Sequence, residues 1–144
     1  MANDELYTPK HIFDALNLTF DLDVCAPKEG PLHTPANKWF SLEDDGLAKE
    51  WVGRVWMNPP YSNPTPWIDK WIDHNNGVAL VGFSKANWFG RLWNSEAMGV
   101  CLPTNTAVID RQSKKQQIWM PVSLWAIGET NITALRMSGF GRIR

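Results

Sequence analysis

The feature that most constrains this chain is the tetrapeptide Asn58-Pro59-Pro60-Tyr61. It follows a short apolar run at residues 54–57 and precedes a turn-rich segment at 62–66 that predicts no regular element. It is therefore expected just past the carboxyl end of a strand, the edge where open α/β sheets bind ligands. The consecutive prolines fix two φ angles and remove two N–H donors, which leaves carbonyl acceptors on a stiff backbone. With the side-chain carbonyl of Asn58 and the aromatic face of Tyr61, this corner suits a planar group that carries an NH₂.

Length and composition bound the class of the protein. Its 144 residues predict one domain, 1–144, large enough for a real core. A formal net charge of −1 gives no overall signal for nucleic-acid binding, so any such contact depends on local basic patches. Two cysteines are too few for a disulfide framework or a zinc site. The acidic start of the chain and the lack of a long apolar window predict a cytoplasmic protein without a metal or a membrane span.

Hydrophobic periodicity predicts an α/β fold with a mixed, mostly parallel sheet and an antiparallel hairpin near the C-terminus. Strands are expected at residues 20–26, 37–42, 54–57, 78–83, 99–103, 106–110 and 118–127, the last two flanking a basic loop at 111–117. One helix is expected to begin with Thr8 as N-cap and Pro9 as its first residue. Others are expected at 47–51, along the apolar stripe 67–72 with Gly77 just past its end, and after Trp88 with Phe89, Leu92 and Trp93 toward the core.

Several side chains are expected at the ligand edge of this sheet, and a structural role stays open for each. Asp23, near the end of the first strand and away from its apolar face, is either a surface carboxylate or a carboxylate that binds an ammonium or hydroxyl group. Asp44 and Asp45 either cap the short helix or accept a hydrogen bond from a ligand amine. Trp88 lies either near the site or in the core. The loop 111–117 is either a solvated turn or a phosphate contact.

In their order along the chain, the motifs resemble those of the phage-type DNA N6-adenine methyltransferase (Dam) family. The matching pieces cover most of the chain and are residues 7–9, 22–26, 44–47, Trp51, 55–61, Trp67 and the Trp88-Phe89 pair. The resemblance implies an abridged Rossmann-like class I fold with S-adenosylmethionine as methyl donor. It also implies a site-specific DNA-methyltransferase (adenine-specific), which methylates the N6 amine of a base flipped out of double-stranded DNA. The family context adds a bacteriophage origin and a link to restriction-modification.

The resemblance also implies roles for individual residues. The catalytic, base-holding set is Asn58, Pro59, Pro60 and Tyr61. The cofactor contacts are Tyr7, Thr8, Pro9, Asp23, Cys25, Ala26, Asp44 and Asp45, and one of the last two reads the cofactor's adenine. The contacts with the base and the DNA are Trp88, Phe89, Lys85, Arg111, Lys114 and Lys115. The chain departs from the wider superfamily in its cofactor half, which is abridged. A single late glycine, Gly30, replaces the usual glycine-rich turn, and residues 23–58 are too few for two strand–helix units.

Two alternatives stay open beside DNA methylation. The motif Asn-Pro-Pro-Tyr also serves methyltransferases that act on RNA amines or on protein glutamine amides, since each acceptor is an NH₂ on an sp² carbon. The other alternative is a degenerate nucleic-acid-binding module that has lost catalysis. No separate target-recognition domain is expected, so sequence recognition would depend on short loops or on a second subunit in a homodimer.

Overall fold

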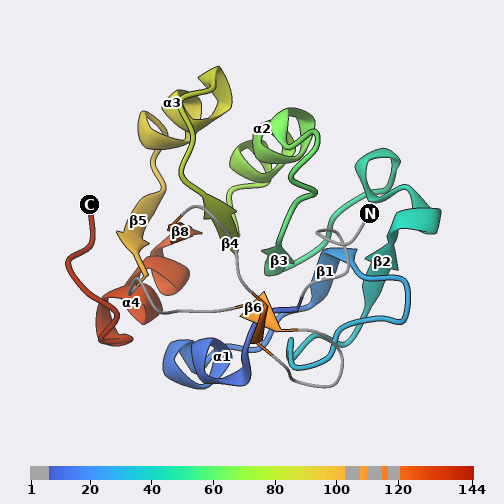
Figure 1. The fold of residues 1–144 in the computed structure, drawn as a ribbon, viewed down its shortest axis with the longest axis horizontal. Helices are drawn as coiled ribbons and strands as arrows, with labels where there is room; N and C mark the ends of the chain where they lie inside the picture. The colour runs from blue at the N-terminus through green and yellow to red at the C-terminus, as the bar shows by residue number, and fades with distance from the viewer. Residues whose placement is uncertain (1–6, 103–107, 110–114, 117–120) are drawn as a thin grey trace.

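A six-stranded sheet forms the middle of the protein, and helices cover both of its faces (Figure 1). The structure is a computed structural model that describes residues 7–102, 108–109, 115–116 and 121–144. The strands of the sheet are β1 (Leu22–Ala26), β2 (Trp39–Ser41), β3 (Val55–Met57), β4 (Gly77–Gly82), β5 (Met98–Cys101) and β8 (Val122–Ile127). The helices are α1 (Lys10–Leu16), α2 (Thr65–His74), α3 (Asn87–Trp93) and α4 (Glu129–Met137). The 3₁₀ turns η2 (Leu42–Asp44) and η3 (Gly46–Ala48) lie between β2 and β3.

The strands lie in the order β2-β1-β3-β4-β8-β5. The neighbours from β2 to β4 are parallel, whereas β8 is antiparallel to both β4 and β5, so the prediction of a mixed, mostly parallel sheet is confirmed. A separate antiparallel ribbon joins β6 (Val108–Ile109) to β7 (Lys115–Gln116). The predicted hairpin partners were wrong. β8, the described part of the strand expected at 118–127, pairs with β4 and β5, while β6 pairs with residues of the expected basic loop.

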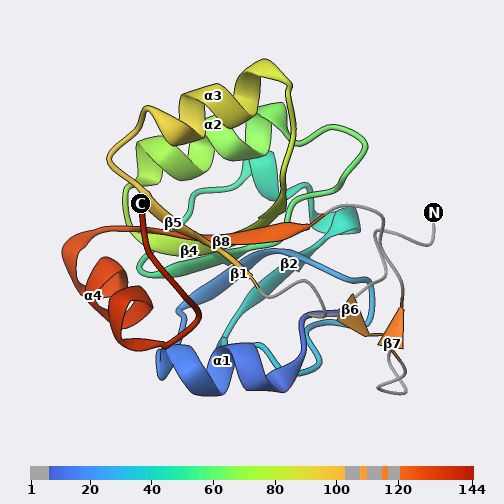
Figure 2. The ribbon, with the colours of Figure 1, turned by 60° about the vertical axis from the view of Figure 1, so that its left-hand side comes forward.

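Each face of the sheet carries a hydrophobic core under a pair of helices. α2 and α3 cover one face, and α1 and α4 cover the other, as the two ribbon views show (Figures 1 and 2). Val55 and Met57 of β3 belong to the core under α2 and α3, whereas Trp56 between them belongs to the core under α1. All residues of β4 and β8 are buried, as expected of strands covered on both faces.

The first helix and the acidic segment differ from their predictions. Pro9 takes the N-cap position of α1 with extended backbone, and Thr8 is buried instead of capping the helix with its side chain. The helix expected at 47–51 is replaced by η2 and η3. The carbonyl oxygen of Gly46, which would accept a backbone N–H in an α-helix, instead accepts the indole N–H of Trp51 at 2.8 Å.

Helix ends elsewhere also shift from their expected places. α2 begins at Thr65, inside the segment expected to be irregular, because proline is tolerated in the first turn of a helix. Its left-handed cap is Asn75, with φ of 62°, and not Gly77, which starts β4. Trp93, expected toward the core, is 53% exposed at the end of α3. The helix α4 was not predicted from the sequence, because its buried residues are too few to show a clear apolar stripe.

Candidate functional site

The sheet has a topological switch point between β1 and β3. From β1 the chain continues to β2 on one side and then returns to β3 on the other side of β1. Such a reversal opens a crevice at the carboxyl ends of the strands, and open α/β sheets bind ligands there. Asp23 of β1 pairs with Trp56 of β3. Because β1 and β3 are parallel neighbours, the end of β1 with Cys25 and Ala26 lies at the same edge of the sheet as the tetrapeptide that follows β3.

Asp23 is a buried carboxylate in β1, one of the two strands at the switch point, and only 3% of its surface is exposed. Its neighbour Trp56 packs against Phe13 of α1, with ring centroids 4.7 Å apart. The Oδ1 of Asp23 accepts a hydrogen bond from the backbone N–H of Cys25 at 3.2 Å. Burial raises the pKa of Asp23 from 3.8 to about 7, although the Cys25 hydrogen bond acts in the opposite direction. The interpretation of Asp23 as a surface carboxylate is therefore wrong, and a ligand cation would relieve its desolvation.

The acidic turn formed by Asp44 and Asp45 lies against the same end of β1. A Cβ at Gly46 would collide with the carbonyl oxygen of Val24, so only glycine permits this close approach. The Oδ2 of Asp44 accepts hydrogen bonds from the backbone N–H and the hydroxyl of Ser41, at 2.8 and 3.1 Å. Asp45 is exposed, has φ of 53°, and makes no capping hydrogen bond with its side chain. Of the two exposed carboxylates, Asp44 has one oxygen engaged by Ser41, whereas Asp45 makes no side-chain hydrogen bond with the residues that the structure describes.

Helix α2 holds the segment that follows this turn. The Nζ of Lys70 donates hydrogen bonds to the carbonyl oxygens of Leu47 and Lys49, at 2.9 and 2.5 Å. The same ammonium lies 4.9 Å from the centre of the Trp51 ring, within the range of a cation–π contact. Since α2 begins four residues after Tyr61, one helix joins the acidic turn to the tetrapeptide corner.

The tetrapeptide leaves the sheet directly after β3, as predicted. Pro59 is buried, whereas Asn58, Pro60 and Tyr61 are half-buried. The side-chain amide of Asn58 makes no hydrogen bond with any residue that the structure describes. Its carbonyl and its NH₂ are thus both open to a ligand at the end of the strand that lies between β1 and β4.

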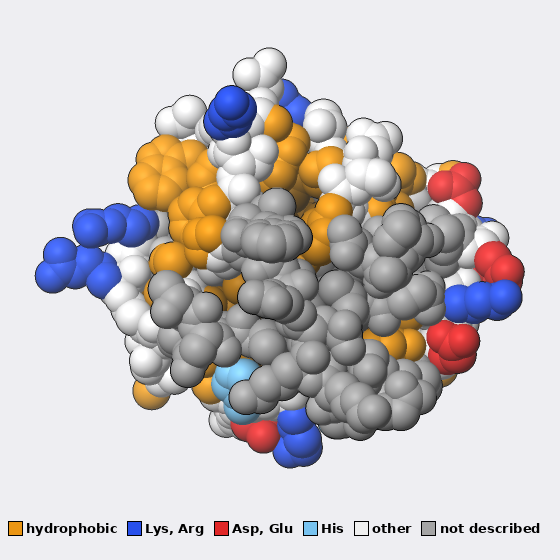
Figure 3. Space-filling model, in the orientation of Figure 1, with side chains coloured by type: hydrophobic (Ala, Val, Ile, Leu, Met, Phe, Trp, Pro, Cys, Tyr) orange, Lys and Arg blue, Asp and Glu red, His pale blue; other side chains and the backbone are white. Residues whose placement is uncertain are grey.

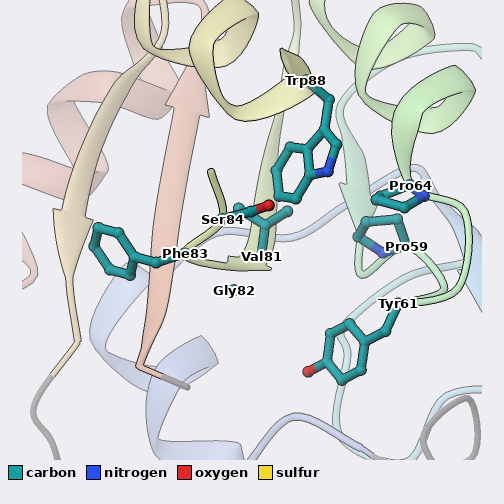
Figure 4. A pocket seen from close by; sticks show the side chains of 8 residues that line it. All are labelled: Pro59, Tyr61, Pro64, Val81, Gly82, Phe83, Ser84 and Trp88. Atoms are coloured by element: carbon teal, nitrogen blue, oxygen red, sulfur yellow. The ribbon is translucent and has the colours of Figure 1, made fainter. Parts of the chain in front are cut away.

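A pocket of about 130 Å³ opens beside the tetrapeptide, between the carboxyl ends of β3 and β4. Figure 4 shows the indole of Trp88 opposite Pro59, with the ring of Tyr61 at the same border. The pocket is lined by Pro59, Tyr61, Pro64, Val81, Gly82, Phe83, Ser84 and Trp88. Its walls are largely apolar and partly flat, and a cavity of roughly 150 Å³ is known to hold a benzene ring. The pocket is therefore suited to a planar ring, and it brings together Pro59, Tyr61 and Trp88 as predicted from the sequence.

The predicted neighbours of Trp88 lie around the pocket. The ring of Phe89 packs against Phe83 and Trp88, with centroids 5.4 and 5.6 Å away, and is not among the lining side chains. Phe89 therefore supports the wall of the pocket. Lys85 is exposed and directly follows the lining residue Ser84.

The predicted cofactor contacts from the start of the chain lie near α1 and at the end of β1. Tyr7 and Thr8 are buried, and Pro9 leads into α1. Cys25 is half-buried and Ala26 is buried. Their contacts with a cofactor stay predictions.

The predicted basic contacts fall mostly outside the described residues. This holds for Arg111 and Lys114, and for Lys115 only the backbone of β7 is described. On the described part of the face in Figure 3, lysine and arginine side chains stand in separate groups near the outline.

Within the described ranges, no group of three or more His, Cys, Asp or Glu residues could hold a metal ion. Those ranges also contain no helix of the length and apolarity that a membrane span requires.

Gly46 and Lys70 shape the site and were given no role from the sequence. Gly46 belongs to the acidic motif 44–47 that was identified in the sequence. Its role could not be predicted, because its contact with Val24 joins segments far apart in the chain. Lys70 lies on the amphipathic helix α2, where a lysine is expected to face solvent, so the sequence did not indicate its contacts with the preceding turn.

Fold and site together define an α/β protein with a pocket beside the tetrapeptide, at the carboxyl edge of its sheet, and with the buried carboxylate of Asp23 on the neighbouring strand β1. The chain belongs to the DNA N-6-adenine-methyltransferase (Dam) family, whose model matches residues 1–106, so the resemblance found in the sequence is confirmed.

Two phage proteins are similar to this chain, and both are described as DNA N-6-adenine-methyltransferase. The protein of Haemophilus phage HP1 (strain HP1c1) is 39% identical over 70 residues, which cover 45% of this chain and 39% of that protein. The protein of Escherichia phage T1 is 37% identical over 68 residues, which cover 43% of this chain and 27% of that protein. The matched segments thus span well under half the length of either relative. No solved structure matches the chain.

Proposed function

We propose that this chain transfers a methyl group from S-adenosylmethionine to the N6 amine of adenine in DNA. The observation that carries the proposal is the place of the open Asn58 amide, directly after β3, which lies between β1 with the buried Asp23 and β4 with the flat-walled pocket at its end. Family membership and the two phage relatives support DNA as the substrate and adenine as the base. The switch point between β1 and β3 supports the expected abridged Rossmann-like methyltransferase fold.

The crevice suits S-adenosylmethionine, which carries an ammonium, a sulfonium and an adenine. The buried carboxylate of Asp23 suits a cation, because a positive charge nearby offsets the desolvation that raises its pKa. We assign the hydrogen bond from the cofactor's adenine amine to Asp45, because both of its carboxylate oxygens are available, whereas the Oδ2 of Asp44 is engaged by Ser41. When bound, the cofactor supplies a methyl group that its sulfonium has already activated. The further contacts that we propose are Tyr7, Thr8, Pro9, Cys25 and Ala26.

The pocket suits the base. The exocyclic amine of adenine is a poor nucleophile because its lone pair is delocalised into the ring. The side-chain carbonyl of Asn58 and the backbone carbonyl of Pro59 accept the two amine hydrogens, which localises the lone pair and aims it at the crevice. Pro59 and Pro60 bring no N–H that would compete with the amine. The ring of Tyr61 stacks on the base.

The DNA delivers this base by flipping it out of the duplex, since a stacked base cannot reach an enclosed pocket. Lys85 is exposed beside the pocket and is placed to contact a phosphate. Arg111, Lys114 and Lys115 are proposed as further phosphate contacts.

The test is Asn58→Ala, with Asn63→Ala as its matched control on the exposed loop that follows. Purified variants are incubated with S-adenosylmethionine and DNA, and N6-methyladenine is measured by nucleoside mass spectrometry. Loss of a transition-state hydrogen bond predicts a fall of about 100-fold or more for Asn58→Ala, with no change in melting temperature and little change for Asn63→Ala. Substantial residual turnover by Asn58→Ala would sink the assigned role.

Parallel reactions with RNA and with a glutamine-containing peptide test the acceptor. Methylation of either one, with none on DNA, would overturn the choice of DNA. Calorimetric titration with S-adenosylmethionine tests for a non-catalytic binding module, for which no heat of cofactor binding is expected.

A further inference from the structure

We infer that Ser84 reads the base in the pocket, by donating a hydrogen bond from its hydroxyl to the ring nitrogen beside the exocyclic amine. The inference rests on the proposed function and deepens it, because it assigns a residue that determines specificity for the base. The base is then recognised by a donor and acceptors set on opposite sides of one pocket, as well as by its flat shape.

Strand β4 positions Ser84 at the pocket. The residue lies two positions past Gly82, the last residue of β4, and it lines the pocket together with Val81 and Trp88. Figure 4 shows its hydroxyl oxygen directed toward the Trp88 ring, on the side facing Pro59. Most of the other lining side chains are hydrocarbon or aromatic, so this hydroxyl is one of the few polar groups that a base in the pocket can meet.

The hydrogen bonding of Ser84 leaves its donor unused. Its Oγ accepts a hydrogen bond from the backbone N–H of Ala86 at 3.0 Å, which fixes the oxygen at the edge of the pocket. A hydroxyl has one hydrogen to donate and two lone pairs to accept with. The bond to Ala86 occupies one lone pair, and the hydroxyl hydrogen has no acceptor within the part of the chain that the structure describes. A ligand acceptor in the pocket would satisfy it.

The polarity across the pocket is complementary to adenine. On the β3 side, the lining residue Pro59 directly follows Asn58, and the carbonyls of these two residues are the proposed acceptors of the amine; on the β4 side, Ser84 lines the pocket. Adenine carries a donor amine that is flanked by acceptor nitrogens, N1 on one side and N7 on the other. When the amine meets Asn58, one of these nitrogens is turned toward the opposite side of the pocket. A site built to hydrogen-bond its substrate discriminates well against an analogue that lacks the bonding atom.

Nucleoside binding tests this inference without any methylation assay. The probes are 2′-deoxyadenosine and its 1-deaza and 7-deaza analogues, each of which lacks one of the two acceptors. Saturating S-adenosylhomocysteine occupies the cofactor side, and binding is followed by NMR through the indole N–H signal of Trp88, assigned with Trp88→Phe. We expect the removal of one of the two nitrogens to weaken binding to the wild type about five- to tenfold, the worth of one hydrogen bond. Which analogue loses affinity shows whether N1 or N7 faces Ser84.

Variants of Ser84 separate recognition from local structure. Ser84→Ala should bind deoxyadenosine about five- to tenfold more weakly and should not distinguish the three nucleosides, whereas Ser84→Thr should keep the distinction. The control is Ser95→Ala. Ser95 also accepts an N–H from two residues ahead, that of Ala97, but its own hydroxyl already donates to the carbonyl of Leu92. Ser95→Ala should keep the wild-type discrimination.

Three results would overturn the inference. These are equal affinities for all three nucleosides in the wild type, discrimination that persists in Ser84→Ala, or no shift of the Trp88 signal up to the solubility limit of the nucleoside. The proposed function fails separately. A wild type that forms no N6-methyladenine on DNA but shows the predicted discrimination refutes methyl transfer and keeps the role of Ser84. A wild type that methylates DNA but binds all three nucleosides equally refutes the role of Ser84 and keeps the proposed function.

Discussion

Replacing Asp23 by asparagine should stabilise the protein at neutral and alkaline pH. The folded state holds this carboxyl in a buried place that raises its pKa from 3.8 to about 7, whereas the unfolded chain exposes it to water. Below pH 3.8 the carboxyl of Asp23 is protonated in both the folded and the unfolded state, so its burial does not lower the free energy of unfolding there. As the pH rises to about 7, the unfolded state releases the proton first, so the free energy of unfolding falls over this range. An asparagine has no proton to lose, and its side-chain oxygen can still accept the N–H of Cys25.

The magnitude follows from the two pKa values. The interval from 3.8 to about 7, at about 1.36 kcal/mol for each pH unit, gives on the order of 4 kcal/mol. That is a large part of the ~5–15 kcal/mol that stabilises a typical domain. The free energy of unfolding of Asp23→Asn, relative to wild type, should therefore rise steadily between pH 4 and pH 7 and level off above that.

Urea unfolding of both proteins between pH 4 and pH 8, followed by tryptophan fluorescence, measures this difference. Asp73→Asn is the matched control, because Asp73 is an exposed carboxylate on α2 and should show no such rise. A difference between Asp23→Asn and wild type that stays constant with pH would refute the reasoning, since the burial of an ionisable group would then not limit stability.

Two further predictions concern the segment beside the crevice. Gly46→Ala should lower the free energy of unfolding by about 1–3 kcal/mol, because its methyl group would collide with the Val24 carbonyl. By contrast Gly90→Ala, with open space around its Cβ on α3, should raise it by about 0.5–1 kcal/mol, and equal effects in urea unfolding would contradict the packing argument. Lys70→Met should speed hydrogen exchange of the amides at 46–50 by about 5- to 30-fold, since two hydrogen bonds and a cation–π contact are lost. Lys10→Met removes only an exposed ion pair and should leave those amides unchanged.

The parts of the molecule that depend on local pattern were predictable from the sequence. The run at 78–83 is continuously apolar because β4 is covered on both faces, and the tetrapeptide marks the end of β3 because its prolines cannot continue a sheet. The alternation around Asp23 placed this residue on the face away from Leu22 and Val24. It did not show that α1 and its core cover that face too, and this is why the carboxylate is buried.

Contacts between distant segments were not predictable. The acidic turn was expected to cap a helix, but the approach of Gly46 to Val24 and the bond from Trp51 back to Gly46 favour tight 3₁₀ turns. The approach of Gly46 to Val24 exists only once the turn has packed against β1, and the Trp51 ring that donates the other bond is stacked on Trp67 of α2. The open hydroxyl of Ser84 is likewise a property of its place in the pocket, since a serine in a turn carries no sign of which hydrogen bonds it will make.

The shortness of the segment between β1 and β3 explains the role of α2. No α-helix lies between these strands, although all of residues 22–57 are described, so only a loop, β2 and the 3₁₀ turns stand where strand–helix units would shape a cofactor site. Such turns are marginal by themselves, because they bury little and their hydrogen bonds are poor. Lys70 supplies bonds to their carbonyls from the helix that follows the tetrapeptide. The position of the acidic turn relative to Asn58 is therefore set within one β3–α2 unit, and this unit would hold the proposed site for two substrates together without helices between β1 and β3.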